Sequence, residues 1–169
     1  RFNSDPQVHA YIVQLPLPPQ LDEEAALLAI NPDKDADGLH PVNLGRLVMG
    51  VDGPLPCTPQ GIQLMLETYE IPVEGKHVCV IGRGLTIGRP MALLMALKRP
   101  TANAAVTVVH TGVPDLDFYT RQADIVIAAC EGISGNAAIA NDVSNSAACA
   151  GQSLDSINSS TSSFEYAAQ

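Results

Sequence analysis

The residues whose spacing is most suggestive of chemistry are three glycines, Gly82, Gly84 and Gly88, accompanied by Arg83 and Arg89. Gly82 and Gly84 allow a tight turn and leave no side chain between backbone and ligand, and Gly88 allows a following helix to pack closely. A helix that begins behind glycines presents free N–H groups and a positive dipole end, which attract anions. The pattern G-x-G-x-x-x-G is a variant of the dinucleotide-binding motif, although it also fits a glycine turn without a nucleotide.

The segments around these glycines are those of an α/β nucleotide-binding unit. Residues 77–98 predict a buried parallel strand, the glycine turn and a helix with Pro90 in its first turn. Further along the chain we predict a strand over 105–109, a short helix over 116–122 and a strand over 124–129. This β-α-β-α-β order predicts one mononucleotide-binding half of a doubly wound sheet.

The end of the second predicted strand favours NADP over NAD. An acidic residue usually binds the ribose 2′-OH of NAD about 20 residues after the glycines. Here the strand ends in His110 and Thr111, without a carboxylate, and four of the nine basic residues lie between Arg83 and Arg99. A 2′-phosphate would therefore meet the cations of Arg83 and Arg89.

Composition excludes several other classes of protein. The 169 residues can bury a real core, and the net charge of −9 argues against nucleic acid as a partner. No apolar run reaches the length of a membrane span and no signal peptide is visible, although the chain begins without methionine. The four cysteines and four histidines lack metal-ligand spacing. We expect reduced thiols, no metal and a cytoplasmic location.

The first part of the chain contains a proline-rich loop and an acidic loop. Residues 8–14 predict a strand that runs into prolines at 16, 18 and 19, and residues 22–30 predict a short helix with an acidic first turn. Asp33, Asp35 and Asp37 imitate an EF-hand loop, but its twelfth position is Leu44 instead of glutamate. Two alternatives remain, a solvated acidic loop or a loop that directs the carboxylate of Asp37 toward a ligand.

A helix near residue 58 separates this part from the glycine-rich unit. We predict Thr58 as its N-cap and Pro59 as its first residue, with an apolar face drawn from Ile62, Leu64, Met65, Leu66 and Tyr69. We expect one domain over 1–60 and a second over 61–130. Residues 131–169, rich in Ser, Ala and Asn, contain no Lys or Arg and look like a loop or tail, with 137–143 as a possible short element.

Four motifs in order resemble the bifunctional methylenetetrahydrofolate dehydrogenase/cyclohydrolase (FolD) family over about residues 5–130. They are Gln-Leu-Pro-Leu-Pro at 14–18, Lys-Asp-Ala-Asp-Gly at 34–38, Pro-Cys-Thr-Pro-Gln-Gly at 56–61 and the glycine-rich stretch 82–90. The Gly-Arg-Gly and His-Thr-Gly variants are similar to the actinobacterial branch. The resemblance implies a two-domain α/β protein, with a partial folate-binding catalytic domain and a Rossmann-like, doubly wound parallel-sheet NADP domain.

The resemblance also implies an activity and a set of site residues. The family oxidises 5,10-methylenetetrahydrofolate with NADP, hydrolyses the methenyl product to 10-formyltetrahydrofolate, and forms homodimers. Gln14 and Asp37 match catalytic positions, and a carboxylate at 37 suits the N–H groups of a pterin edge. For Cys57 two alternatives remain. The resemblance places it beside the folate cleft, but it can equally be a small buried residue without a role in binding. The matched folate contacts are Val13, Gln14, Leu15 and Asp37, and the matched cofactor contacts are Gly82, Arg83, Gly84 and Thr111.

Three family segments have no match in this sequence. The catalytic lysine of the Tyr-x-x-x-Lys motif would precede residue 1, and the Val-Ile-Asp-Val-Gly and Pro-Gly-Gly-Val-Gly segments do not occur in 131–169. We therefore predict that these 169 residues alone lack cyclohydrolase activity. The alternatives are a nucleotide- or folate-binding fragment without turnover, and a different NADP oxidoreductase that shares only the second domain.

Overall fold

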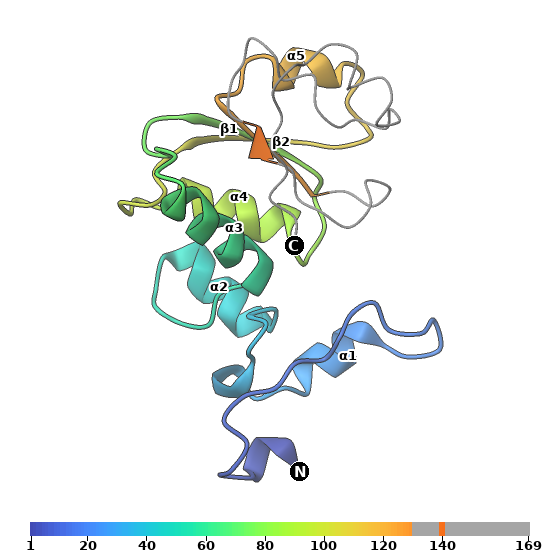
Figure 1. The fold of residues 1–169 in the computed structure, drawn as a ribbon. Coiled ribbons are helices and arrows are strands. Elements are labelled where there is room, and N and C mark those ends of the chain that lie inside the picture. Colours follow the sequence, from blue (N-terminus) through green and yellow to red (C-terminus); the bar gives the residue numbers. More distant parts are fainter. Residues whose placement is uncertain (130–138, 141–169) are drawn as a thin grey trace.

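The computed structural model describes residues 1–129 and 139–140 and has a mixed α/β architecture (Figure 1). Short 3-10 helices, η1 (Phe2–Ser4) and η2 (Pro32–Lys34), lie in the N-terminal part. The helices are α1 (Glu23–Leu28), α2 (Pro41–Met49), α3 (Cys57–Thr68), α4 (Gly88–Ala96) and α5 (Leu116–Thr120). The strands are β1 (His77–Ile81), β2 (Ala105–Val109), β3 (Ile125–Ala128) and β4 (Ile139–Ala140).

The sheet has the strand order β2-β1-β3-β4. β1 pairs in parallel with β2 and β3, whereas β4 is antiparallel to β3. The three predicted strands are confirmed, but their order differs from the prediction. A mononucleotide-binding half would place β3 next to β2, whereas here β3 pairs with β1 on the side opposite to β2. The order 2-1-3 is the second common order of doubly wound sheets. In it the order of strands switches from one side of the first strand to the other, and ligands bind at that switch point. The glycine turn that follows β1 lies at this point.

Helices cover both faces of the sheet (Figure 1). α4 packs on β1 and β2 and is itself covered by α2 and α3, while α5 contacts β2 from the opposite face. Alternate residues of β1 serve the two faces, because strand side chains have a period of two. The larger core contains Leu47, Ile62, Leu66, Val73, Val78, Val80, Met91, Leu94, Met95, Ile125 and Ile127. The core under α5 contains Cys79, Ile81, Val109, Ala123 and Val126.

The start of α3 differs from the prediction. The helix begins at Cys57 after Pro56, so Thr58 is not its N-cap. Pro59 is instead its third residue, a position where the missing N–H still costs nothing because the first four N–H groups of a helix have no intrahelical partner. Of the predicted apolar face, Ile62 and Leu66 are buried. The others are exposed; Leu64 is 61% exposed, Tyr69 63% and Met65 38%.

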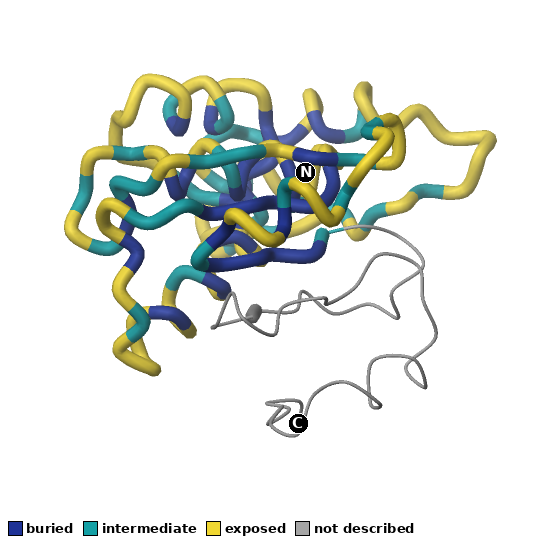
Figure 2. The backbone as a smooth tube through the Cα atoms, turned by 90° about the horizontal axis from the view of Figure 1, so that it is seen from above, coloured by how far each residue is buried: buried dark blue, intermediate teal, exposed yellow. Residues whose placement is uncertain are grey.

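The N-terminal part is held by loops more than by regular structure. The predicted strand over 8–14 is wrong, since Tyr11 makes only an isolated parallel bridge with Asp35. The predicted helix over 22–30 is confirmed as the shorter α1, in which Asp22 caps the N–H of Ala25 at 3.0 Å. Figure 2 shows buried backbone concentrated in the sheet and its helices, whereas the first forty residues are mostly exposed or intermediate.

α2 was not among the predicted elements. It begins at Pro41, with the His40 ring accepting the N–H of Val42 at 3.1 Å, and it ends at Gly50, whose φ is 66°. These are ordinary start and stop signals, proline in the first turn and glycine in the left-handed conformation. The sequence analysis treated the preceding residues as an acidic loop and therefore did not predict this helix.

Of the predicted tail 131–169, only Ile139–Ala140 is described, as β4; the rest lies outside the described residues. The expected short element over 137–143 coincides with that strand at these two residues. In the described part of the chain, no helix has the length and apolar character needed to cross a membrane.

Candidate functional site

The turn after β1 depends on two glycines that touch. Gly82 has a φ of 122°, a conformation that favours glycine, and its N–H donates to the carbonyl of Val109 at 2.7 Å. A Cβ built on Gly88 would lie 2.4 Å from the Gly82 carbonyl oxygen, closer than any side chain tolerates. The predicted close packing of the helix is therefore confirmed, and its partner is the turn backbone itself.

Gly84 has a different role from its neighbours. A Cβ at this position would meet nothing within 4 Å, and its φ is outside the left-handed region. Its carbonyl accepts the N–H of Arg89 at 3.1 Å, which ties the turn to the first residues of α4. Glycine here relieves no strain; its effect is to leave open space above the turn.

The N-terminus of α4 faces this space without a side-chain cap. Ile87 occupies the N-cap position and makes no capping hydrogen bond. The N–H groups of Arg89 and Met91 are bonded to the carbonyls of Gly84 and Ile87, and Pro90 has no N–H. The start of the helix therefore offers an anion the N–H of Gly88 and the partial positive charge of the helix dipole.

The end of β2 brings a second group of residues to the same edge. Ile81 and Val109 are register partners, so the residues that follow both strands are neighbours. Arg83 Nη1 lies 3.2 Å from Nε2 of His110, and the N–H of Gly112 donates to Nδ1 of His110 at 3.0 Å. The structure thus brings Gly82, Arg83 and Gly84 close to the segment that holds Thr111, which is exposed. Sequence reasoning used His110 as a non-acidic strand end and as part of the His-Thr-Gly motif, and it missed the contact with Arg83.

The Asp37 loop lies against the start of α3. Gly38 has a φ of 66°, and a Cβ there would lie 2.4 Å from the carbonyl carbon of Leu55. This close approach fixes the turn that carries Asp37, which is half-buried. On its other side the loop runs beside the N-terminal segment, where Tyr11 donates its N–H to the carbonyl of Lys34 at 2.9 Å.

A buried polar network supports this loop from beneath. Asp35, 1% exposed, accepts the His40 N–H at 2.8 Å and the Asn43 side-chain amide at 2.9 Å, both through Oδ2. The Asn43 amide also donates to the carbonyl of Pro32 at 2.8 Å. Oδ1 of Asp35 is buried and has no hydrogen-bond partner among the residues that the structure describes. The acidic loop is therefore not merely solvated, because one of its carboxylates organises the turn.

Cys57 lies beside Asp37. Its Sγ–H donates to the carbonyl of Ala36 at 3.0 Å. Although the residue is exposed overall, partial burial of the sulfur raises the pKa of the Cys57 thiol above its usual 9.0, and the carboxylates of Asp37 and Asp35 raise the pKa further. Cys57 is therefore a neutral thiol at neutral pH. The interpretation as a small buried residue is wrong, and its place beside the Asp37 loop agrees with the other alternative.

The residues predicted around Gln14 divide into two groups. Val13 and Leu15 pack against a small core made of Leu27, Ile30 and Leu39. Gln14, between them, is exposed and donates its side-chain amide to the carbonyl of Leu15 at 2.8 Å. Since Leu39 follows Asp37 by two residues, this shared core holds the two predicted folate segments together.

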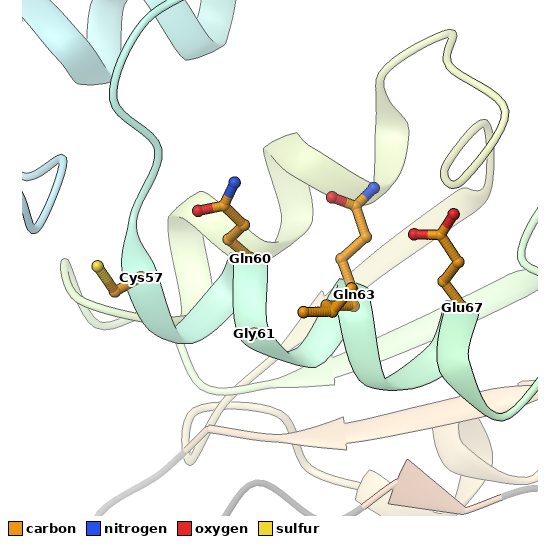
Figure 3. Close-up of a pocket in the computed structure, with 6 residues that line it drawn as sticks. Cys57, Gln60, Gly61, Gln63 and Glu67 are labelled. Carbon is orange, nitrogen blue, oxygen red and sulfur yellow. The ribbon is translucent and has the colours of Figure 1, made fainter.

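An open groove runs along α3 from Cys57 and has a volume of about 340 Å³. Figure 3 shows Gln60, Gln63 and Glu67 on one side of the helix, with Cys57 at its start. The sequence analysis did not single out this polar face. Elsewhere among residues 1–129, no group of three or more His, Cys, Asp or Glu side chains is arranged to hold a metal ion.

Comparison with known families gives two adjacent matches. Residues 56–147 match the family model "Tetrahydrofolate dehydrogenase/cyclohydrolase, NAD(P)-binding domain", which extends past the limit near residue 130 that the sequence motifs set. Residues 1–37 match "Tetrahydrofolate dehydrogenase/cyclohydrolase, catalytic domain".

Two curated relatives are both named as bifunctional FolD proteins. The chain is 63% identical over 134 residues to "Bifunctional protein FolD" of Syntrophotalea carbinolica, covering 78% of this chain and 46% of that protein. It is 58% identical over 135 residues to "Bifunctional protein FolD 1" of Salinispora tropica, covering 80% and 44%. The chain thus spans about half the length of the curated relatives it matches.

Solved structures agree with the fold. The bifunctional FolD enzyme of Campylobacter jejuni superposes with a TM-score of 0.72 at 45% identity, over 76% of this chain and 45% of that one. The Trypanosoma brucei FolD enzyme, solved with NADP cofactor and an inhibitor, gives a TM-score of 0.69 at 41% identity, over 76% and 43%.

Proposed function

The chain belongs to the tetrahydrofolate dehydrogenase/cyclohydrolase family, and on that premise we propose that the protein oxidises 5,10-methylenetetrahydrofolate with NADP to the methenyl form. Hydrolysis to 10-formyltetrahydrofolate would follow in the intact enzyme. The observation that carries this proposal is the meeting of Gly82, Arg83 and the end of β2 at one edge of the sheet. A dinucleotide requires such an edge, where backbone donors, open space and a cation lie together.

The residues present fit NADP. Gly84 leaves room above the turn, the start of α4 offers the N–H of Gly88 and a positive dipole end to the pyrophosphate, and Arg83 offers a cation to the 2′-phosphate. The relative from Trypanosoma brucei was solved with NADP, which supports the same cofactor here. When bound, the nicotinamide supplies the hydride acceptor. Gly82, Arg83, Gly84 and Thr111 would bind and orient the cofactor.

For the folate, we propose Val13, Gln14, Leu15 and Asp37 as binding residues. The half-buried carboxylate of Asp37 can accept two N–H groups from a 2-amino-4-oxo ring edge, a charge-assisted pair with a defined plane. Gln14 is exposed, and its side-chain amide can exchange the hydrogen bond to the carbonyl of Leu15 for one to the substrate. Both residues would act catalytically by positioning, which can supply much of the acceleration of hydride transfer.

The remaining expectations follow from the same family. We propose a folate-binding domain over 1–60, a nucleotide-binding domain over 61–130 and a homodimer that works in the cytoplasm without nucleic acid. The chain contains no Tyr-x-x-x-Lys motif, so the proton transfer of hydrolysis has no evident agent within these residues. We keep the prediction that these 169 residues alone lack cyclohydrolase activity.

The test compares two arginine variants. NADPH formation from methylenetetrahydrofolate would be followed by absorbance, alongside calorimetric binding of NADP and NAD. Arg83→Ala should weaken NADP binding by about tenfold or more, the value of a charge-assisted hydrogen bond, while NAD binding changes little. Arg121→Ala removes the same charge from the end of α5, where Arg121 pairs with Asp117 at 3.0 Å, and should have no effect.

The outcomes separate the alternatives. Binding of NADP without NADPH formation by the 169 residues would favour a binding fragment. NADPH formation from an unrelated substrate, without methylenetetrahydrofolate, would favour a different oxidoreductase. Equal loss in the two arginine variants would remove the assignment of Arg83.

A further inference from the structure

Arg46, on α2, contacts the polar network beneath the Asp37 loop. Its Nη1 donates to the side-chain oxygen of Asn43 at 2.9 Å. The amide nitrogen of Asn43, which is fully buried, donates to Oδ2 of Asp35 at 2.9 Å. The same Oδ2 accepts the N–H of His40 at 2.8 Å, so the Asp35 carboxylate joins the two ends of the turn that contains Asp37. A chain of hydrogen bonds therefore runs from Arg46 to the base of this turn.

Arg46 decides which way the Asn43 amide faces. A guanidinium has only donors, whereas an amide side chain has an acceptor oxygen at one end and a donor nitrogen at the other. Because its oxygen faces Arg46, Asn43 presents its nitrogen to the Asp35 carboxylate. The reversed amide would place its oxygen against that carboxylate, and two buried acceptors that face each other are strongly unfavourable. The cation of Arg46 therefore sets the polarity of the network.

The Asp35 carboxylate depends closely on that polarity. It is 1% exposed, and within the described part of the chain both of its hydrogen bonds reach Oδ2, while Oδ1 has no partner. Loss of the bond from Asn43 would leave it with the N–H of His40 as its donor. The turn that carries Asp37 would then lose one of the two bonds that fix its base.

On the basis of the proposed folate binding, we propose that Arg46 is a positioning residue for the substrate. It acts through Asn43 and Asp35, and it fixes the orientation in which the carboxylate of Asp37 meets the N–H groups of the pterin edge. A carboxylate that accepts two N–H groups must lie in their plane. A small rotation of the turn therefore weakens both hydrogen bonds to the folate.

Gly53 restrains the Arg46 side chain from its other side. A Cβ at position 53 would lie 2.7 Å from Cδ and 3.6 Å from Nη1 of Arg46. The φ of Gly53 is outside the left-handed region, so its backbone does not demand glycine. The loop between α2 and α3 thus leaves room for the arginine stem and directs the guanidinium to Asn43. The ion pair of Arg46 with Asp33, at 3.5 Å, is the weaker restraint, because the Asp33 side chain is 78% exposed.

The first experiment measures calorimetric binding of 5-formyltetrahydrofolate, a stable folate with the 2-amino-4-oxo ring, and of NADP. Arg46→Met keeps an apolar stem but removes every donor. We expect its affinity for the folate to fall about tenfold and its affinity for NADP to change less than about twofold. Arg46→Lys, which restores a cationic donor, should recover part of the loss. Asp33→Asn is the matched control, since it removes the exposed partner of Arg46 and should change neither affinity.

A second experiment follows the position of Asp37 without any ligand. Because the Asp37 carboxylate raises the pKa of the Cys57 thiol, displacement of that carboxylate should speed alkylation of Cys57 by iodoacetamide. We expect Arg46→Met to increase the rate a few-fold in the unaltered background and clearly less in the Asp37→Asn background, because the two changes disturb one interaction. Gly53→Ala, which displaces Arg46 but keeps its donors, should act in the same direction.

The outcomes separate this role from the proposed function, with unfolding curves to identify the variants that are folded. Unchanged folate affinity in folded Arg46→Met, or an equal loss of NADP affinity, would overturn the positioning role while folate binding by the unaltered chain stands. Equal acceleration of alkylation in both backgrounds would overturn the link to Asp37. If the unaltered chain binds no folate, the proposed function fails, and the alkylation rates still decide whether Arg46 fixes the Asp37 turn.

Discussion

The glycine-turn edge and the Asp37 loop are stabilised in different ways. At the first, two parallel strands end and α4 begins at one place, and residues of β1 and α4 belong to the larger core. At the second, an isolated bridge, a core of three buried residues and the hydrogen bonds of one buried carboxylate maintain the loop. The first is a rigid frame made of regular structure, whereas the second is an irregular loop whose shape depends on a few individual contacts. The following predictions test that contrast.

The largest loss of folding stability should come from the larger core, which contains α4 and β1 residues. Leu94 is 1% exposed in α4, and Leu94→Ala should lower the free energy of unfolding by about 2–5 kcal/mol through lost burial and a cavity. Leu27→Ala, in the three-residue core near the loop, should lie at the low end, about 2 kcal/mol, because that site can collapse more easily. Denaturant unfolding measures both, and equal losses would contradict the contrast.

The next effect should come from the contact between the two glycines. Gly88→Ala places a methyl group against the Gly82 carbonyl, and because backbone must move to make room, we expect a loss of about 1–3 kcal/mol and of NADP binding. Gly84→Ala is the matched control for folding stability only, since its methyl group would enter the space that we assign to the cofactor and would touch no part of the protein. Thermal unfolding of both variants checks this, and an equal loss of stability in Gly84→Ala would contradict the role given to the contact between Gly88 and Gly82.

The loop should respond to loss of one amide. Asn43, which is fully buried, donates to Asp35 and to the carbonyl of Pro32, so Asn43→Ala should cost about 1–3 kcal/mol by leaving buried acceptors short of partners. The control is Gln63→Ala, whose half-buried amide bonds to Thr101 where water can replace it. We expect folate binding to weaken in the Asn43 variant while NADP binding is retained. Parallel losses of both ligands would mean that the two regions are not independent.

The smallest effect concerns reactivity. Because Asp37 raises the pKa of the Cys57 thiol, Asp37→Asn should lower that pKa and increase the thiolate fraction at any pH below it. Alkylation of Cys57 by iodoacetamide, followed by peptide mass spectrometry, should become a few-fold faster. The increase is limited because burial, the larger cause, is unchanged. Asp33→Asn, on an exposed side chain of the same loop, should leave the rate as it is.

The contrast also explains what the sequence could predict. β1, β2 and β3 follow from apolar runs such as 105–109, and the glycine turn follows from spacing, because local pattern and tertiary burial agree there. The segment 8–14 was also predicted as a strand, but among the described residues it has no strand beside it and forms one bridge at Tyr11. The strand order around β1 depends on pairs such as Val78 with Ile125, and the contact between Arg83 and His110 joins residues 27 positions apart; no local pattern specifies either.

The site shows the same limit. Asp37 was chosen from its motif, and the motif predicted neither the support from Asp35 and Asn43 nor the thiol of Cys57 beside it. A buried polar network is a property of the folded chain. Pro41 and Gly50 signal the ends of α2, the helix that carries Asn43, but they do not signal the hydrogen bonds that Asn43 makes.

α4 contacts the sheet on one side and α2 and α3 on the other, and its first residue touches the glycine turn. An anion held at that turn stabilises only the state in which α4 is docked. The exchange of backbone amide hydrogens in α2 and α3, which pack on α4, should therefore slow as the turn is filled. At a nucleotide concentration one hundred times the dissociation constant, the free energy of opening should rise by up to about 2.7 kcal/mol. The amides whose exchange slows would identify the helices that unfold together with the turn.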